Sequence, residues 1–371
     1  MKKAKILVYI TGIIMAVVTM FFSAGCRKST EHKTKVGIIL PMTGILAEMG
    51  QYEKQAMMLG AEHLNKSGPS DIELIFEDGK GDNKAVAAAA AKLLDVDKVQ
   101  MLITSTTGAS LTARPLAERR NVPLIAFCMG SDLAPGSKST IRYYIGIEEE
   151  SGAIMRRLGA YPRDTKIGVL FASAPVWKTA ITDLYQPFLT SHFITPPTIE
   201  EYAVNDTDFR PQISRLKNAG VRVLVLLGYG FEYTPIFNQM EELRLRDNLE
   251  ILGGWGFLYT PVPPRMLEGI EVAGPTYVID RGAGRDSFES DFTKKYGRTP
   301  NFDAAFAYEV AIRLPDLLNL LHTAPPSGMK AALFNEGVIN GVVGQYHFTP
   351  DGNMIVGTGM GIFRDGHIKE H

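Results

Sequence analysis

Residues 221–227 read VRVLVLL and are followed by Gly228, Tyr229 and Gly230, and this stretch decides the fold class. Apart from Arg222 the run is apolar and lacks the alternation of polar and apolar residues that a half-exposed strand shows. Such a run beside glycines predicts a strand buried on both faces. Strands of this kind belong to parallel sheets that helices cover on both sides, so the stretch predicts an α/β fold.

The residues on either side of this strand predict helices. Before it, Phe209, Ile213 and Leu216 recur at helical spacing, and this helix ends at Gly220, which suits the left-handed position after a helix end. After it, residues 235–245 predict a further helix. The order helix, strand, helix is the repeating unit of a parallel α/β sheet.

The same alternation covers the rest of the chain. Further strands are predicted at residues 36–40, 72–76, 101–104, 123–127, 167–171 and 251–252. Helices are predicted between them, among others at residues 109–120 and 304–321. Turn residues between short apolar runs predict hairpins within residues 345–368. The chain therefore holds two consecutive α/β units, and periodicity alone allows either one large sheet or two lobes with a cleft.

The first 26 residues predict an export signal. Three lysines within the first five residues precede an uncharged, mostly apolar run, and small residues end this run directly before Cys26. A cysteine at this position predicts lipoprotein processing, in which Cys26 is acylated and becomes the mature N-terminus. Ser23 stands where such signals usually carry leucine. The alternative is an uncleaved membrane anchor, because the run approaches the length that spans a bilayer. In either case, residues 1–26 are expected to lie outside the fold.

The composition and length of the chain exclude some classes of partner and suggest the number of domains. A formal net charge of −1 argues against a nucleic-acid partner, since binding phosphates needs a basic excess. The length of 371 residues suggests two domains. Of the two cysteines, acylation or removal of Cys26 leaves Cys128 without an intrachain partner. Cys128 lies in an apolar run and is interpreted as a small buried residue rather than a reactive thiol.

The motifs of enzymes and metal sites are missing from the sequence. The seven histidines are scattered without the spacing of metal ligands. Residues 78–82, DGKGD, resemble the start of a calcium loop, but Ala89 stands where that loop needs glutamate. Residues 357–361, GTGMG, lack the glycine spacing and the following helix of a dinucleotide site. We therefore predict a protein that is not an enzyme and has no metal and no cofactor.

Four segments carry a family resemblance. They are KVGIILPMTGILAEMGQYEKQAMMLGAEHLN at 35–65, IELIFEDGKGDNKAVAAAAAKLL at 72–94, LITSTTGASLTARPLAERRNVPLIAF at 102–127 and VRVLVLLGYGFEYTPIFNQMEELRL at 221–245. In this order they resemble the type I periplasmic solute-binding proteins of the leucine/isoleucine/valine receptor branch. The resemblance extends from Lys35 to nearly the end of the chain.

The resemblance implies two Rossmann-like lobes with parallel sheets, joined by three hinge crossovers. Matching puts lobe 1 at residues 35–146 plus 276–345, and lobe 2 at residues 147–275 plus 346–371. The crossovers are expected near residues 145–147, 273–277 and 345–348. Ligands of open α/β sheets bind beyond the carboxyl ends of the strands, so two such lobes are expected to form one ligand cleft.

The resemblance also implies a function. It is that of an exported receptor, which captures a small organic carboxylate or an amino acid and delivers it to the permease of an ABC transporter. The expected location is the periplasm or cell envelope, with a lipid on Cys26 as the link to the membrane. The alternative is a sensing or regulatory envelope lipoprotein of the same fold, because a fold does not settle function.

The first candidate site is the segment from Ser105 to Gly108, between a predicted strand and a predicted helix. Hydroxyls and free backbone N–H groups at a helix N-terminus suit an anion. In the family, the position of Thr107 helps to hold the ligand carboxylate. The alternative is that Thr106 or Thr107 only caps the helix.

The second candidate site is the segment from Cys128 to Ser131, after the next strand. The family uses backbone groups and a hydroxyl here for the same carboxylate. This chain departs from the family sequence, because Ser131 supplies the segment's one hydroxyl and Cys128 and Gly130 supply backbone groups. The alternative is a plain loop.

The remaining candidates are mostly aromatic. Trp177 and Tyr229 match family positions at which tyrosines cover the ligand, and a place in the core is the alternative for each. Trp255 stands where the amino-acid receptors carry an acid that pairs with the ligand's ammonium group. Met49 and Phe302 match further positions that line the cleft.

Because Trp255 stands where these receptors carry an acid, the expected ligand changes. A buried ammonium group without a partner carries a heavy desolvation cost. The sequence therefore predicts a small carboxylate with an apolar or aromatic body ahead of a branched-chain amino acid. Glu232 is the alternative acid that would restore an amine site.

Overall fold

A computed structural model describes residues 33–67, 71–258, 262–275, 277, 284–323, 325 and 328–370, and residues 35–371 form one compact unit. The predicted export signal and Cys26 lie outside the described residues. Among the described helices, none is both long and apolar enough to cross a bilayer.

The first lobe is built on a five-stranded sheet with the order β2-β1-β3-β4-β5. Its strands are β1 (Thr34–Leu40), β2 (Ile72–Asp78), β3 (Met101–Ser105), β4 (Leu124–Phe127) and β5 (Thr140–Arg142). The pairs β1–β3, β3–β4 and β4–β5 are parallel. The strands β1, β3 and β4 are buried over nearly their whole length, as the unbroken apolar runs of the sequence predict.

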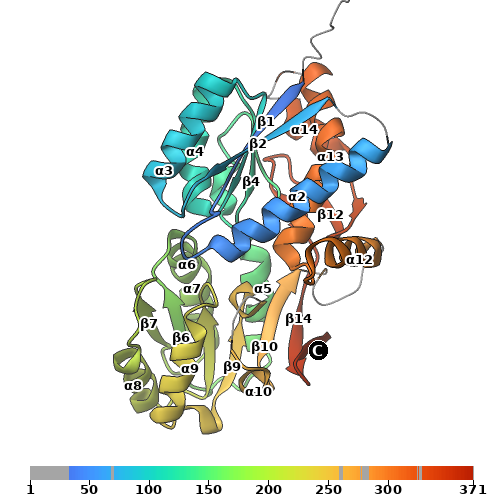
Figure 1. Cartoon of the computed structure of the whole chain (residues 1–371). Coiled ribbons are helices and arrows are strands. Elements are labelled where there is room, and N and C mark those ends of the chain that lie inside the picture. The colour runs from blue at the N-terminus through green and yellow to red at the C-terminus, as the bar shows by residue number, and fades with distance from the viewer. Residues whose placement is uncertain are drawn as a thin grey trace, which may run out of the picture. The chain divides into compact units, whose positions relative to one another are not determined.

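Helices cover both faces of this sheet. Figure 1 shows α3 and α4 on one side and α2 and α13 on the other. The bounds are α2 (Ala47–Ser67), α3 (Asn83–Ala91), α4 (Thr107–Arg119), α12 (Arg285–Tyr296), α13 (Phe302–Thr323) and α14 (Met329–Asn335), with a short π-helix at Lys92–Asp97 and a 3-10 turn at Ser131–Leu133. Successive β1 residues serve different cores: Ile39 packs with the α3–α4 side, whereas Ile38 and Leu40 join the larger core on the other side. This is the period-two geometry of a strand.

The second lobe is built on a seven-stranded sheet with the order β15-β14-β10-β9-β8-β6-β7. Its strands are β6 (Ile167–Ala172), β7 (Thr198–Tyr202), β8 (Val223–Leu227), β9 (Glu250–Gly253), β10 (Glu271–Pro275), β14 (Thr358–Arg364) and β15 (His367–Glu370). From β7 to β10 neighbouring strands are parallel, whereas β14 and β15 are antiparallel additions. The parallel part, β7-β6-β8-β9-β10, repeats the strand order of the first lobe.

The helices of the second lobe follow its strands. They are α5 (Ile147–Leu158), α6 (Pro175–Ala180), α7 (Gln186–His192), α8 (Arg210–Ala219), α9 (Tyr233–Glu242) and α10 (Pro264–Leu267), with a π-helix at Ile181–Tyr185 and 3-10 turns at Arg246–Asn248 and Trp255–Leu258. Gly220 follows α8 with a φ of 73°, the left-handed conformation expected of it. The prediction of two α/β lobes with parallel sheets is confirmed, and a single large sheet is excluded within the described residues.

A third, small sheet helps to locate the last crossover. It has the order β11-β12-β13, with β11 (Ile339–Gly341), β12 (Gly344–Phe348) and β13 (Met354–Val356). Buried Arg142, at the end of the first sheet, donates hydrogen bonds of 2.9 Å to Asn353 Oδ1 and 3.0 Å to the Met354 carbonyl. The hairpin β12–β13 thus bonds to the first lobe. We therefore propose that the third crossover lies at residues 356–358, about ten residues later than the sequence predicts.

Candidate functional site

A cavity of about 180 Å³ lies between the carboxyl ends of the two sheets. The first lobe lines it with residues after β1, β3 and β4, and the second lobe with residues after β6, β8 and β9. These strands are the three central strands of the first sheet and of the parallel part, β7-β6-β8-β9-β10, of the second sheet. One water molecule needs roughly 10–15 Å³ by this measure, so the cavity has room for a small organic molecule.

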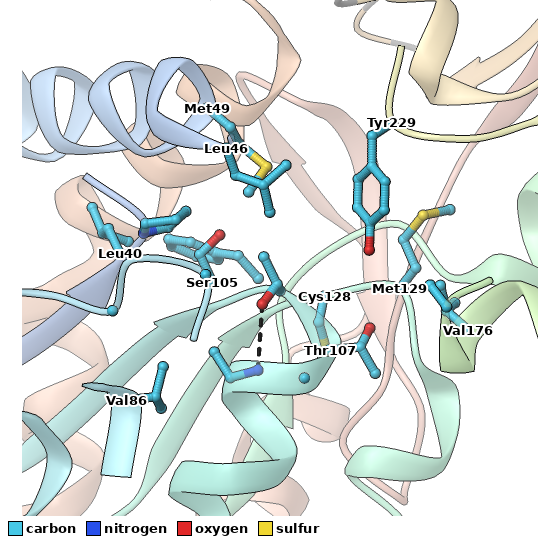
Figure 2. A pocket seen from close by; sticks show the side chains of 18 of the residues that line it. Leu40, Leu46, Met49, Val86, Ser105, Thr107, Cys128, Met129, Val176 and Tyr229 are labelled. Atoms are coloured by element: carbon cyan, nitrogen blue, oxygen red, sulfur yellow. Dashed lines mark hydrogen bonds between the residues drawn. The ribbon is translucent and has the colours of Figure 1, made fainter. Parts of the chain in front are cut away.

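The N-terminus of α4 forms the wall on the first-lobe side. Thr106 caps the helix, because its Oγ1 accepts a hydrogen bond of 3.3 Å from the N–H of Ala109. The φ of Thr106 is 76°, a backbone conformation that favours glycine. Thr107, the first residue of the helix, lines the cavity beside it (Figure 2). The free N–H groups at the start of this helix carry partial positive charge, so this wall suits a negatively charged group.

Three aromatic residues form the wall on the second-lobe side. Trp177 belongs to α6, Tyr229 follows β8, and Trp255 opens the 3-10 turn after β9. The ring centroids of Trp177 and Tyr229 are 4.8 Å apart at 79°, and those of Trp177 and Trp255 are 6.1 Å apart at 17°. Figure 2 shows the Tyr229 hydroxyl directed into the cavity. The mutual packing holds these rings in place and presents an apolar surface to an apolar or aromatic molecule.

Two buried acids support this aromatic wall from behind. Glu232 Oε1 accepts hydrogen bonds of 2.8 Å from the N–H of Tyr229 and 2.7 Å from the hydroxyl of Tyr202. Glu150 Oε2 accepts one of 2.7 Å from the N–H of Trp255. Neither acid is among the described residues that line the cavity. Burial raises the pKa of both carboxyl groups, that of Glu150 to about 8.

A third acid, Glu53 of α2, does line the cavity. Only 1% of its surface is exposed. Its Oε1 accepts a hydrogen bond of 2.7 Å from Ser105 Oγ, and its Oε2 has no partner within the described part of the chain. Burial raises the pKa of Glu53 well above its ordinary value, and the nearby Asp303 carboxyl raises it further, against the opposing effect of the Ser105 hydrogen bond. These surroundings favour the uncharged form of Glu53.

The surroundings of Cys128 and Tyr229 in the lining likewise favour the uncharged forms. Burial raises the pKa of the Cys128 thiol to about 11. Burial and the nearby carboxyl group of Glu232 raise the pKa of Tyr229 to about 12. The described lining residues include no lysine, arginine or histidine. The positive electrostatic potential of the cavity therefore comes from the N-terminus of α4 rather than from a charged side chain of the described lining.

The geometry agrees with the comparison to known protein families. Residues 33–363 match the model of a family described as periplasmic binding protein. The chain belongs to the periplasmic binding protein family.

Individual relatives are distant. The Leu/Ile/Val-binding protein homolog 3 of Brucella melitensis is 23% identical over 235 residues, which are 62% of this chain and 63% of that protein. The substrate binding protein LivJ of Streptococcus pneumoniae, solved with isoleucine, has a TM-score of 0.77 at 21% identity, over 91% of this chain and 97% of that chain. A solute binding protein of an ABC transporter from Rhodopseudomonas palustris, solved with 3,4-dihydroxy benzoic acid, has a TM-score of 0.75 at 21% identity, over 90% of this chain and 94% of that chain. These likenesses show a shared fold.

In this periplasmic binding protein, most of the residues singled out from the sequence come together around the cavity. Those that line it are Met49, Thr106, Thr107, Cys128, Trp177, Tyr229 and Trp255. They come from both lobes and from six different loops or helices. Their roles toward a ligand remain predictions, but their positions make a single site possible.

Three predicted residues do not line the main cavity. Gly130 and Ser131 line a smaller cavity beside it, which Thr107 shares. The hydroxyl of Ser131 donates a hydrogen bond to Glu148, so it is already engaged. Phe302 is buried behind Trp255, with ring centroids 6.4 Å apart. These residues thus support the lining or extend it.

The sequence analysis missed Glu53, and it did not predict the hydrogen bond of Glu53 with Ser105, the residue that opens the first candidate segment. A signal for Glu53 was available. It follows Met49 by four residues and precedes buried Ala56 by three, so a charged residue stands on the buried stripe of α2. An acid in such a position needs a partner or a function, because burying its charge is costly. The pairing of Ser105 with Glu53 had no such signal, because the two residues are 52 positions apart in the chain.

Proposed function

We propose that this periplasmic binding protein captures a small organic acid with an apolar or aromatic body, and delivers it to an ABC transporter. The observation that carries the proposal is the cavity itself, with a helix N-terminus on one wall and packed aromatic rings on the other. In this proposal the Thr107 hydroxyl and the N–H groups at the start of α4 hold the carboxylate. Trp177, Tyr229 and Trp255 cover the apolar body.

The names of the relatives support this ligand class without deciding it. They include proteins solved with isoleucine and with 3,4-dihydroxy benzoic acid. An amino acid needs an anionic partner for its ammonium group. Glu150 and Glu232 do not line the cavity, and the surroundings of Glu53, which does line it, favour the uncharged carboxyl. The organic acid is therefore the better match to the lining.

Delivery and location belong to the same proposal. We propose that residues 1–26 direct export, and that Cys26 carries a lipid that keeps the protein at the cell envelope. A transport role requires that deletion of the gene abolish uptake of the labelled ligand. Uptake that persists, together with an altered regulatory response to the ligand, would indicate a sensor instead.

A thermal-shift screen tests the ligand class. The mature protein is heated with benzoate, 4-hydroxybenzoate, 4-methylpentanoate and leucine, and hits are measured by calorimetry. A ligand at 100 times its Kd stabilises the folded state by about 2.7 kcal/mol, which gives a clear shift. We expect 4-methylpentanoate or an aromatic acid to bind more tightly than leucine. Submicromolar binding of leucine without binding of its deaminated analogue, 4-methylpentanoate, would refute the proposed ligand class.

A further inference from the structure

We propose that Glu53 enters the binding reaction as a neutral acid and donates a hydrogen bond to an oxygen of the bound solute, so that it selects organic acids over amines. The inference rests on the function proposed above and adds a residue to it. It starts from the cavity wall, where the buried carboxyl of Glu53 has one oxygen bonded to Ser105 and the other without a partner.

The hydrogen bonds around Glu53 and Asp303 show which of the two acids keeps the proton. Asp303 Oδ1 accepts a hydrogen bond from the hydroxyl of Tyr144, and its Oδ2 accepts one of 3.4 Å from Asn301 Nδ2. Asp303 also lies in the first turn of α13, where the helix N-terminus favours a negative charge. Glu53 has one donor, Ser105, and lies in the second turn of α2 without such an advantage. Any negative charge that the pair carries therefore resides on Asp303, and Glu53 remains protonated.

Glu53 lies within reach of a ligand held at Thr107. Its partner Ser105 ends β3, and Thr107 begins α4 two residues later. Glu53 and Thr107 both line the cavity of about 180 Å³, so a small ligand that fills the cavity lies between them. The O–H of a neutral carboxyl is a donor, whereas a charged carboxylate only accepts. A neutral Glu53 thus stabilises a ligand oxygen and offers no counter-charge to an ammonium group.

Two substitutions of Glu53 separate these roles. Glu53→Gln keeps the size and a hydrogen-bond donor but cannot become charged, whereas Glu53→Ala removes the group. With benzoate, 4-hydroxybenzoate and 4-methylpentanoate as probes, we expect Glu53→Gln to keep the wild-type Kd within about threefold at pH 7, and Glu53→Ala to weaken binding about 10- to 100-fold. Glu73→Gln, at an exposed glutamate of β2, serves as the control and leaves Kd unchanged.

The pH dependence of the wild type gives a second measurement that needs no substitution in the wall. The groups around Glu53 are Asp303, Ser105 and Tyr144, and the cavity adds Cys128 and Tyr229, whose pKa values lie at about 11 and 12. Burial also raises the pKa of Asp303 to about 7 and that of Glu150, behind the aromatic wall, to about 8, whereas Glu53 is the acid that lines the cavity itself. Affinity for the acids is therefore expected to fall with rising pH more steeply in the wild type than in Glu53→Gln, and an equal fall in both proteins would contradict the inference.

The outcomes are distinct. If an acid binds and the alanine and glutamine variants behave as expected, the inference is supported. If an acid binds but Glu53→Ala leaves Kd unchanged, the inference is overturned and the proposed function stands. If leucine binds and Glu53→Gln weakens it more than 100-fold, Glu53 is a charged partner of an ammonium group, and both the inference and the organic-acid class are wrong. Failure of every probe to bind the wild type contradicts the proposed ligand class and, with it, the inference.

Discussion

Glu150 accepts a hydrogen bond of 2.7 Å from the backbone N–H of Trp255, and its side chain is completely buried. The bond joins α5, the first helix of the second lobe, to the 3-10 turn that carries the tryptophan of the aromatic wall. Trp255 occupies the place at which the sequence comparison expects an acid in amino-acid receptors. An acid is thus present near this position, but it lies behind the ring and holds its backbone.

The first prediction concerns the stability of this arrangement. Burial raises the pKa of Glu150 from its ordinary value of 4.5 to about 8. Between these values the folded state binds a proton that the unfolded state has lost, so stability falls as pH rises through this window. Glu150→Gln still accepts from Trp255 and cannot ionise. We expect it to match the wild type near pH 4.5 and to be about 2–4 kcal/mol more stable at pH 9, as measured by urea denaturation.

The control for this prediction is Glu73→Gln, which removes an exposed charge. Its free energy of unfolding should differ little from that of the wild type at either pH. An equal effect of Glu150→Gln at both pH values would mean that Glu150 is charged in the folded protein throughout.

The second prediction concerns Thr106, whose φ of 76° and ψ of 149° are costly for a residue with a branched Cβ. Such conformations cost about 1–3 kcal/mol, and replacing a capping threonine by glycine costs only a few tenths. We therefore expect Thr106→Gly to raise the free energy of unfolding by about 0.5–2 kcal/mol while weakening ligand binding. Thr106→Ala is the matched control, because it loses the cap and keeps the strain, and it should destabilise the protein by about 1 kcal/mol. A glycine variant less stable than the alanine variant would contradict this account.

The third prediction tests the carboxylate site. Thr107→Val removes the hydroxyl while nearly conserving volume, so the fold should persist and ligand binding should weaken by about 1.5–3 kcal/mol, the value of a hydrogen bond to a charged group. Calorimetry with the tightest acid from the screen measures this loss. Thr112→Val, further along α4 and outside the cavity lining, is the control. Unchanged affinity of Thr107→Val would mean that the anion is held elsewhere or that the ligand is not an anion.

The fourth prediction is closure of the lobes around the ligand. The chain crosses between the sheets after β5, after β10 and after β13, and hinge motion at a few such connecting residues is common in this architecture. We expect the radius of gyration in small-angle scattering to decrease when the tightest acid saturates the protein. Leucine, if it fails to bind in calorimetry, provides the control at equal concentration. A radius of gyration that stays constant at saturation would refute the hinge prediction.

Much of the fold follows from the sequence because its signals are local. The unbroken apolar run of β8 and the helix that ends at Gly220 are each specified by contiguous residues. The sequence likewise predicted that Thr107, Trp177 and Tyr229 follow the ends of strands. The carboxyl ends of parallel strands lie at one edge of a sheet, so these residues were expected to lie near one another. These residues indeed line one cavity.

The position proposed for the last crossover and the polar groups of the cavity wall both depend on tertiary structure. Arg142 and Asn353 are 211 residues apart, and their hydrogen bond attaches to the first lobe a hairpin that the sequence analysis placed mostly in lobe 2. Glu53 and Ser105 are 52 residues apart, and Asp303 lies on a third element. A strand or helix depends on the spacing of neighbouring residues, whereas the charge state of a buried carboxyl depends on which distant groups the packing brings around it. The sequence therefore determined where a site could form, and only the packing of the two lobes determined which polar groups and which protonation states it contains.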